Sequence, residues 1–378
     1  MITAASRGTP PKYVEALRAI PRSQLPPLQE VADKVRTEER LSPADGLTLL
    51  LTHEIDLVGE LATTVRLRKN PEHRVTYIVD RNINPTNVCI ARCQFCAFDR
   101  LPGDPEGYVL SHEQIFEKVQ ELLDLGGIQV LLQGGHHPEL GIDFYEDLFR
   151  ALRERFPTLH IHGLSPSEVH HIMRVSRLDL ATTIERLRAA GLDSIPGGGG
   201  EILADRVRLK IAPGKSLSQE WLGVMREAHH QGLRTTATMM YGHVETLEER
   251  IEHLMLLRDL QDETGGFTAF ICWPFQPGGS ELDLPKTGAN EFLRTNAVSR
   301  VMLDNFDHQQ TSFVTQGAKL GQLALLFGCD DFGGTMLEEN VVSATGTELL
   351  MPIDQIEHCI RTAGFEPARR TMRYEVLS

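Results

Sequence analysis

The sequence predicts an α/β fold, a (β/α)8 TIM-type barrel with an N-terminal helical extension. Eight short segments rich in apolar residues recur between residues 75 and 334, with amphipathic helical patterns between them. Strands that alternate with helices are typical of parallel β/α units. Several of the segments mix polar with apolar residues, which favours a barrel with a partly polar lumen over a doubly wound sheet. A barrel with fewer strands and a separate C-terminal element is the alternative.

The region before the barrel, residues 1–70, is expected to form an arm and helices that pack on the barrel, and residues 71–378 are expected to form the barrel itself. Residues 1–25 are rich in Pro and Ser and lack periodicity, so we expect an arm there that is loose or becomes ordered where it docks. A helical pattern runs from Leu28 to Asn70. Within it, Ser42 is expected to cap a helix whose first residue is Pro43.

The predicted strands are VTYIVD (75–80), GIQVLLQGG (127–135), LHIHGLS (159–165), GLDSIPG (191–197), LRTTATMMYG (233–242), GFTAFICWPF (266–275), FDHQQTSF (306–313) and LLFGCDDFGG (325–334). Two helical patterns between them, residues 111–127 and 246–266, end at glycine pairs, which are common helix stop signals. In a barrel of this kind the catalytic groups lie on the loops that follow the strands. The most unusual peptides, including QGGHHPE and PGGGGE, occur in these loops and are therefore expected on one face.

The composition argues against several classes of protein. A formal net charge of −14 disfavours non-specific nucleic-acid binding, which depends on Lys and Arg. No apolar run approaches the roughly 20 residues that span a bilayer, and the N-terminus lacks the apolar core of a signal peptide. We therefore expect a cytoplasmic protein that binds neither membrane nor nucleic acid. Three of its six cysteines, Cys272, Cys329 and Cys359, stand alone and are expected to be buried apolar side chains.

The other three cysteines, Cys89, Cys93 and Cys96, follow the first predicted strand with the spacing C-x3-C-x2-C. A structural zinc site would need a fourth ligand, and c-type haem attachment would need a His where Ala97 stands. A two-cluster ferredoxin run would need a further Cys followed by Pro. Three thiolates suit a 4Fe–4S cluster that leaves one iron open to an exogenous ligand. A zinc-binding structural module and an iron–sulfur electron-transfer protein are the competing interpretations.

With Phe95 before the last cysteine, the peptide CIARCQFC resembles the signature of the radical S-adenosylmethionine (radical SAM) family. The resemblance implies that SAM is the ligand of the open iron and that its reductive cleavage yields a 5′-deoxyadenosyl radical. It also implies an external one-electron donor of the flavodoxin or ferredoxin type. The residues expected to bind the cofactors, besides the three cysteines, are Phe95, Gly134, Gly135 and Glu201. A solvated carboxylate at a helix start is the alternative for Glu201.

Further polar residues follow the predicted strands and are candidates for substrate contacts or for a base. They are Ser165, Glu168, Arg208, His243, Glu245 and Gln276. Ser165 and Glu168 equally fit an ordinary helix N-terminus. His136 and His137 follow the glycine pair, and for each of them a position in the cavity and a position at the surface remain open.

Longer peptides are similar to those of one group within the radical SAM family: VTYIVDRNINPTNVC, SIPGGGGEIL, TTATMMYGHVET and LQDETGGFTAFICWPFQP. The group comprises cyclic dehypoxanthine futalosine synthase of the futalosine pathway to menaquinone, aminofutalosine synthase and deazaflavin (FO) synthase. The segment GGFTAFICWPFQP, with Trp273 and Gln276, favours the first of these. The sequence departs from the group at Pro85, Asp99, Gly200 and Cys272.

This resemblance implies a radical SAM oxidoreductase that acts as a cyclase. A hydrogen is removed from C4′ of the ribose in dehypoxanthine futalosine, and the sugar radical then closes a ring onto the attached benzoate. Loss of an electron and a proton restores the aromatic ring. Glu201, His243 and Glu245 are the candidates for the base, and Arg206, Arg208 or Gln276 is expected to bind the benzoate carboxylate.

We predict that Cys89→Ala, Cys93→Ala or Cys96→Ala abolishes the iron–sulfur absorbance, because each thiolate is expected to hold one iron. The same variants should lose the conversion of SAM to 5′-deoxyadenosine by dithionite under anaerobic conditions. Full brown colour and full activity in Cys93→Ala would contradict the cluster assignment. Stoichiometric zinc without iron in the purified protein would favour the zinc-binding module instead.

Overall fold

The structure is a computed structural model that describes residues 10–346 and 350–377. Its helices are α1 (Val14–Ala19), η2 (Arg22–Gln24), α2 (Leu28–Arg36), α3 (Pro43–Leu51), α4 (Ile55–Lys69), α5 (His112–Asp124), α6 (Ile142–Arg155), α7 (Pro166–Ser176), α8 (Leu180–Ala190), α9 (Asp205–Ile211), α10 (Ser218–His230), α11 (Leu247–Thr264), α12 (Ala289–Met302), α13 (Phe313–Ala324), η3 (Leu325–Phe327), η4 (Ser343–Thr345) and α14 (Ile353–Thr362). Its strands are β1 (Arg74–Ile78), β2 (Asp80–Ile83), β3 (Gln129–Leu132), β4 (His160–Gly163), β5 (Ser194–Ile195), β6 (Arg234–Tyr241), β7 (Phe267–Pro274), β8 (His308–Gln310), β9 (Asp331–Gly334) and β10 (Glu366–Arg369).

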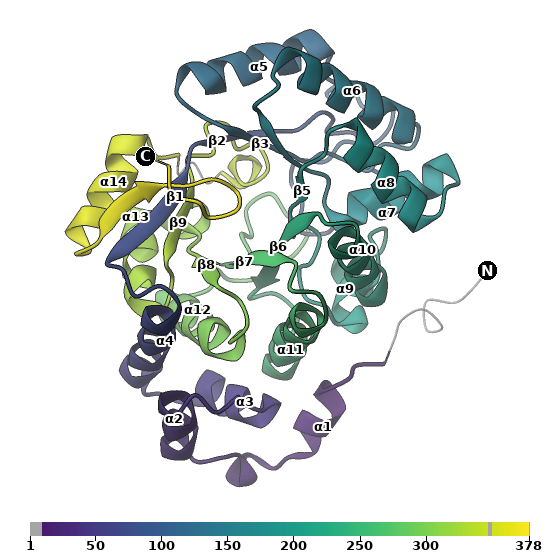
Figure 1. The fold of residues 1–378 in the computed structure, drawn as a ribbon. Coiled ribbons are helices and arrows are strands. Elements are labelled where there is room, and N and C mark those ends of the chain that lie inside the picture. Colours follow the sequence, from purple (N-terminus) through teal and green to yellow (C-terminus); the bar gives the residue numbers. More distant parts are fainter. Residues whose placement is uncertain (1–9, 347–349, 378) are drawn as a thin grey trace.

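The strands form one parallel sheet in the order β10-β1-β9-β8-β7-β6-β5-β4-β3-β2, and helices surround it (Figure 1). Its two ends meet, because β1 and β2 are parts of one run of chain that is interrupted only at Val79. β1 pairs with β9, and β2 pairs with β3. The sheet therefore returns on itself as a barrel, and the eight segments that the sequence predicted as strands all contribute to it.

One further strand joins the sheet beside β1. β10 pairs with β1 on the side opposite β9, where Arg74 lies beside Glu366 and Tyr77 beside Arg369. After Val79 the chain continues as β2, which pairs with β3. The predicted alternative of fewer strands with a separate C-terminal element is therefore wrong, since the C-terminal strand is hydrogen-bonded to the first strand of the sheet.

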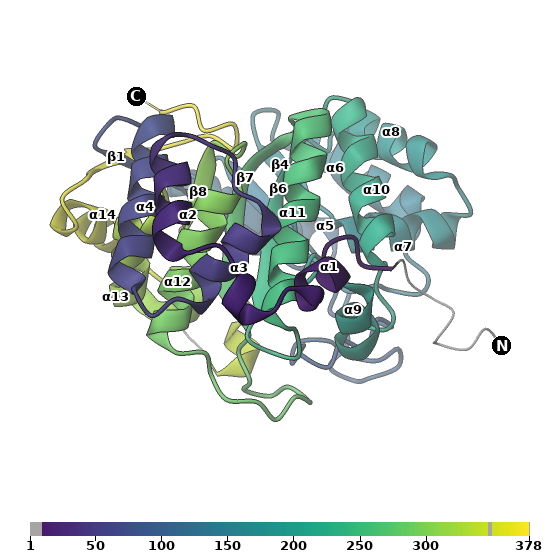
Figure 2. The ribbon, with the colours of Figure 1, turned by 90° about the horizontal axis from the view of Figure 1, so that it is seen from below.

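The N-terminal helices cover one side of the barrel (Figures 1 and 2). α4 packs against α12, and α3 packs against α11 and α12. Ser42 caps α3 and Pro43 is its first residue, as the sequence predicted. The predicted arm is ordered where it docks, because residues 14–19 form α1 against α11; residues 1–9 of the arm lie outside the described residues. The Glu252 carboxylate of α11 accepts the backbone N–H groups of Lys12 and Val14 at 2.7 and 3.1 Å, which fixes the start of α1.

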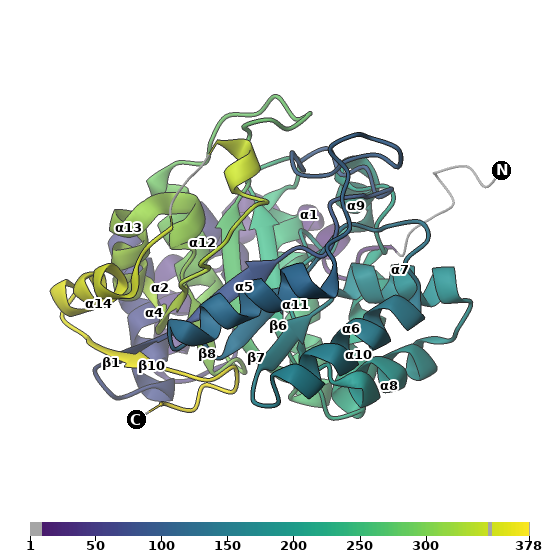
Figure 3. The same cartoon turned by 90° about the horizontal axis from the view of Figure 1, so that it is seen from above.

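Loops that follow β2, β7 and β9 project from the same edge of the barrel (Figure 3). They contain the cysteines, residues 275–288 and residues 335–346, respectively. This edge is the carboxyl end of the parallel strands, where barrel enzymes carry their active sites. In the part of the chain that the structure describes, none of the helices combines the length and apolar character needed to cross a bilayer.

The C-terminal segment closes the lower end of the lumen. Arg370, directly after β10, makes a bidentate ion pair with Asp331 of β9, with N–O distances of 2.5 and 2.9 Å. Both residues are buried, and the guanidinium carbon lies 4.0 Å from the ring centre of Tyr374. Tyr374 in turn stacks on His308 at 3.7 Å between ring centres. The floor of the barrel is therefore polar and made partly by the last residues of the chain.

We predict that Arg370→Ala lowers the free energy of unfolding by about 3–5 kcal/mol, because it leaves Asp331 buried without its cationic partner. Urea unfolding of the purified protein measures this loss. Arg373→Ala is the matched control, since Arg373 is exposed on the same segment and should change stability by less than about 0.5 kcal/mol. Equal effects of the two substitutions would show that the buried ion pair does not hold the tail in place.

Candidate active site

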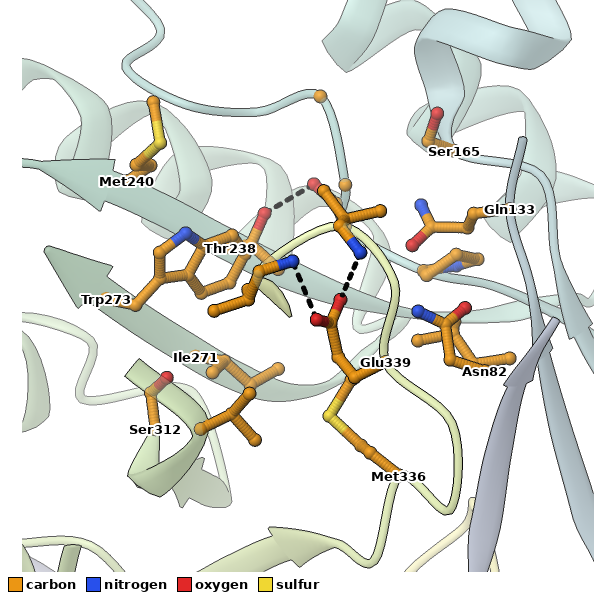
Figure 4. Close-up of a pocket in the computed structure, with 18 of the residues that line it drawn as sticks. Asn82, Gln133, Ser165, Thr238, Met240, Ile271, Trp273, Ser312, Met336 and Glu339 are labelled. Atoms are coloured by element: carbon orange, nitrogen blue, oxygen red, sulfur yellow. Dashed lines mark hydrogen bonds between the residues drawn. The ribbon is translucent and has the colours of Figure 1, made fainter. Parts of the chain in front are cut away.

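A cavity of about 410 Å³ runs from the cysteine loop at the carboxyl edge down to Arg370. Its wall is built by inward-facing side chains of the strands and by the loops that follow them. Figure 4 shows part of this wall, with Asn82, Gln133, Ser165 and Thr238 around the same space as Trp273. The cavity therefore combines polar groups with apolar and aromatic surface.

The loop that carries the cysteines is held by backbone hydrogen bonds to distant segments. The N–H of Cys89 donates to Arg100 at 2.8 Å, and that of Ile90 donates to His136 at 3.1 Å. The N–H of Gln94 donates to Ile211 at the end of α9, also at 2.8 Å. The loop thus has a defined position although it contains no regular helix or strand.

Cys89, Cys93 and Cys96 all line the cavity. Burial raises the pKa of each thiol, and that of Cys93 to about 12. The Cys89 sulfur accepts backbone N–H groups from Ala91 at 3.4 Å and from His136 at 3.3 Å. Such N–H donors stabilise a thiolate and tune a metal bound to it.

The predicted glycine pair lies against this loop. A Cβ on Gly135 would lie 2.2 Å from the carbonyl oxygen of Val88, so no larger residue fits without moving the loop. The N–H of Gly134 donates to the Glu168 carboxylate at 2.8 Å. The same carboxylate accepts the N–H and the hydroxyl of Ser165 at 2.8 and 2.6 Å, which caps α7. Ser165 and Glu168 therefore form a helix N-terminus and line the cavity as well.

Glu201 lies opposite the cysteine loop and pairs with Lys215 at 2.8 Å. Although burial opposes it, the charges of Lys215 and Arg208 lower the pKa of Glu201. Its second oxygen, Oε2, is buried and has no hydrogen-bond partner among the described residues. The Lys215 ammonium lies 5.2 Å from the ring centre of Phe95, so this pair borders the cysteine loop directly. A buried acceptor of this kind suits a ligand hydroxyl.

The structure does not bring three of the predicted site residues to the cavity wall. Arg208 is buried and donates to the carbonyls of Gly199, Gly200 and Ser216, so it holds the glycine loop in place. His243 accepts the N–H of Val244 and bonds the carbonyl of Met240, while Glu245 pairs with Arg250 at 2.8 Å. These side chains organise loops and do not contact the cavity. Arg206, exposed, pairs with Glu249 outside the barrel.

The remaining predicted residues do line the cavity: Phe95, Gly134, Gly135, Ser165, Glu168, Glu201 and Gln276. Of the two neighbouring histidines, His136 lines it and His137 does not. Residues that sequence reasoning missed also line it: Asn82, Gln129, His162, Lys215, Glu339 and Arg370. Those on strands carried a signal, because polar residues at alternate positions of a strand face one side of the sheet. Lys215 and Glu339 carried none, since they lie in irregular loops.

These residues fit the cofactors of a radical SAM enzyme. Three thiols, the close approach of Gly135 and the unpartnered Glu201 oxygen all face one space. Among the described residues, no three His, Cys, Asp or Glu side chains converge on the position of a single metal ion. A cluster has a different requirement, because each iron takes its own thiolate.

Comparison with known proteins defines the class. The profile of the Radical SAM superfamily matches residues 83–257, and that of the CofH/MqnC C-terminal region matches residues 264–378. A relative from Halalkalibacterium halodurans is 44% identical over 92% of this chain and 94% of its own. The chain belongs to the radical SAM superfamily, which confirms the resemblance seen in the cysteine motif.

The relative from H. halodurans is named cyclic dehypoxanthine futalosine synthase. A protein of the same name from Streptomyces coelicolor is 44% identical over 93% of this chain and 89% of its own. An aminodeoxyfutalosine synthase from Thermus thermophilus is 39% identical over 92% of this chain and 95% of its own. Among solved structures, the FeFe-hydrogenase maturase HydG from Carboxydothermus hydrogenoformans has a TM-score of 0.74 at 16% identity, covering 95% of this chain and 83% of its own. That similarity shows the barrel fold.

We predict that Gly135→Ala displaces the cysteine loop, because the new Cβ would collide with the Val88 carbonyl. The free energy of unfolding should fall by about 1–3 kcal/mol, and iron bound per chain after anaerobic reconstitution should fall with it. Gly223→Ala in α10 is the control, since a Cβ there meets nothing within 4 Å and alanine favours a helix. Wild-type iron content and stability in Gly135→Ala would contradict the close-approach argument.

Proposed function

We propose that this chain is a radical SAM cyclase that converts dehypoxanthine futalosine to cyclic dehypoxanthine futalosine in menaquinone biosynthesis. The observation that carries the proposal is that the cysteine motif and a polar, partly aromatic lumen share one cavity. The near full-length similarity to two cyclic dehypoxanthine futalosine synthases supports the choice of substrate.

In this proposal Cys89, Cys93 and Cys96 hold a 4Fe–4S cluster, and the cavity wall beside them binds SAM. Bound together, the two cofactors supply a 5′-deoxyadenosyl radical on receiving an electron from a flavodoxin or ferredoxin. Glu201 Oε2 accepts a hydroxyl of the adenosyl ribose, and Lys215 keeps that carboxylate ionised. Gly134 and Gly135 let the backbone approach the methionine part closely.

Three amide side chains from neighbouring strands are suited to the polar parts of the substrate. Asn82, Gln129 and Gln133 line the lumen, and none of these amides has a hydrogen-bond partner among the described residues. Asn82 and Gln129 each have a buried carbonyl oxygen without a partner. They offer N–H donors to the benzoate carboxylate and acceptors to the ribose hydroxyls. Opposite them, Trp273 supplies an aromatic surface for the benzoate ring.

Gln276 suits a substrate hydroxyl better than the benzoate carboxylate. Its Nε2 donates one N–H to the carbonyl of Pro274 at 3.0 Å, and its buried Oε1 has no hydrogen-bond partner among the described residues. An unpaired carbonyl oxygen accepts a hydroxyl and repels a carboxylate. We therefore assign Gln276 to a donor group of the substrate and the benzoate carboxylate to the amides on β2 and β3.

The loops at the mouth exclude water from the reacting carbons. Glu339 is buried, and its carboxylate accepts the N–H groups of Val341, Val342 and Ser343 at 2.6–3.1 Å, which folds residues 339–343 over the cavity (Figure 4). The loop after β7 packs closely on this segment, because a Cβ on Gly278 would lie 2.1 Å from a carbonyl oxygen of η4. Exclusion of water protects a carbon radical from side reactions.

We predict that the anaerobically reconstituted protein, with dithionite and SAM, converts dehypoxanthine futalosine to a product lighter by two hydrogen atoms. One hydrogen leaves C4′ and one leaves the benzoate ring as the new C–C bond forms. Product masses should be measured beside a parallel assay with the substrate of aminofutalosine synthase, and Cys93→Ala serves as the inactive control. Turnover of only the second substrate would assign the chain to that relative's reaction instead.

A further inference from the structure

His162 lies in the barrel lumen in a position that the proposed cofactor and substrate contacts leave without a role. It is in the middle of β4 and lines the cavity, with 5% of its surface exposed. Its Nδ1 is 2.7 Å from the hydroxyl of Ser194, its partner in the register of β4 and β5. Among the described residues, Nε2 has no hydrogen-bond partner. A ring nitrogen without a partner in a ligand cavity is available to the ligand.

The Ser194 hydroxyl contacts a second histidine. His160, two residues earlier on the same face of β4, has its Nε2 2.7 Å from the same oxygen. A serine hydroxyl has a single proton to donate, so one imidazole donates to it and the other accepts from it. When His162 Nδ1–H is the donor, the chain runs from His162 through Ser194 to His160. In that arrangement Nε2 of His162 carries a lone pair toward the cavity.

Electrostatics keep this imidazole uncharged. Burial, together with the nearby His160 and Arg370, holds the pKa of His162 well below its usual range. At neutral pH the ring is therefore uncharged, and its Nε2 can accept a proton. His160 is only partly buried. Burial lowers its pKa, Asp193 opposes this lowering, and Arg373 and Arg153 add to it. A proton is therefore less costly on His160 than on His162.

Three glutamates of the cavity are less suitable as bases. Asp80 also lines the cavity, and burial raises its pKa to about 6, so it is the competing candidate. Glu168 and Glu339 each accept three hydrogen bonds from the protein, so their oxygens are already engaged. Lys215 lowers the pKa of Glu201, which weakens it as a proton acceptor. His243 and Glu245 do not reach the cavity.

We propose that His162 is the catalytic base of the ring closure and that it passes the accepted proton through Ser194 to His160. The proposal rests on the function proposed above. After the C4′ radical has bonded to the benzoate ring, the ring carbon that was attacked still carries its hydrogen. That C–H bond breaks, and its proton moves to His162 Nε2 while its electron pair returns to the ring. The surplus electron leaves to a one-electron acceptor of the iron–sulfur class, and the aromatic sextet is restored.

The relay is balanced in protons. As Nε2 takes the proton from the ring, Nδ1 gives its own to the Ser194 oxygen, and Ser194 gives its hydroxyl proton to His160 Nε2. After the transfer, His162 and Ser194 are both neutral, so no charge remains in the centre of the lumen. The charge resides on His160, which is partly exposed, and can leave to solvent from there.

The test is the ratio of cyclised product to 5′-deoxyadenosine in single-turnover reactions. In His162→Gln the amide keeps a hydrogen-bonding side chain but removes the base, so we expect that ratio to fall about 100-fold while 5′-deoxyadenosine still forms. In His162→Ala, added imidazole should restore product and the weakly basic pyrazole of the same shape should not. His230→Gln on the surface of α10 is the control and should keep the wild-type ratio.

Ser194 and His160 are positioning residues in this scheme. Ser194→Ala should lower the ratio and Ser194→Thr, which keeps a hydroxyl, should restore it. If His162→Gln does not fold, as judged by its iron content and circular dichroism, the Ser194 pair decides the question. A wild-type ratio in His162→Gln would overturn the proposal and leave the cyclase function standing. Absence of cyclised product from the wild-type protein would instead overturn the function itself.

Discussion

The barrel depends on hydrogen bonds that one stretch of chain, residues 74–83, makes on both of its sides. β1 pairs with β9 and β10, and after the break at Val79 β2 pairs with β3. The cysteine loop begins directly after this stretch, so its starting point is set by both neighbours at once. Val88 then lies against Gly135, at the end of β3, at a distance that only glycine permits. The same hydrogen bonds therefore close the sheet and fix the position of the cysteine loop.

The lumen contains buried charged groups, and removing them from water costs free energy that an apolar lining would not. Lys215–Glu201 near the mouth and Arg370–Asp331 at the floor are buried ion pairs, and desolvation offsets much of the attraction within such pairs. Each pair leaves its neighbourhood polar without leaving a net charge in the middle. The same cavity is lined by the amides of β2 and β3 and the imidazole of His162, together with the carboxylates of Asp80, Glu168 and Glu339. A space with this distribution receives a polar nucleoside-type ligand and still shelters a carbon radical from water.

The strands and the cysteine loop could be predicted from the sequence because local pattern determines them. Alternation of segment types gave the order of the strands, and three closely spaced thiols needed no tertiary information. The rest of the site could not be predicted, because it depends on which partners the side chains of irregular loops contact. The His243 ring bonds to the Met240 carbonyl, and the Arg208 guanidinium donates to glycine carbonyls. Lys215 reaches Glu201 from a turn with no periodic pattern. His162 was visible as a polar residue on a strand, but nothing in the sequence paired it with Ser194.

The pairing of β10 with β1 joins the two ends of the barrel domain across almost 300 positions of sequence, from Arg74 to Glu366. A ribosome delivers those partners at very different times, and contacts of such separation close late in folding. Until residues 366–374 emerge, the lower opening of the lumen has neither Arg370 nor Tyr374 across it. The lumen can therefore exclude water at this end only after residues 366–374 have been made and have paired with β1 and β9.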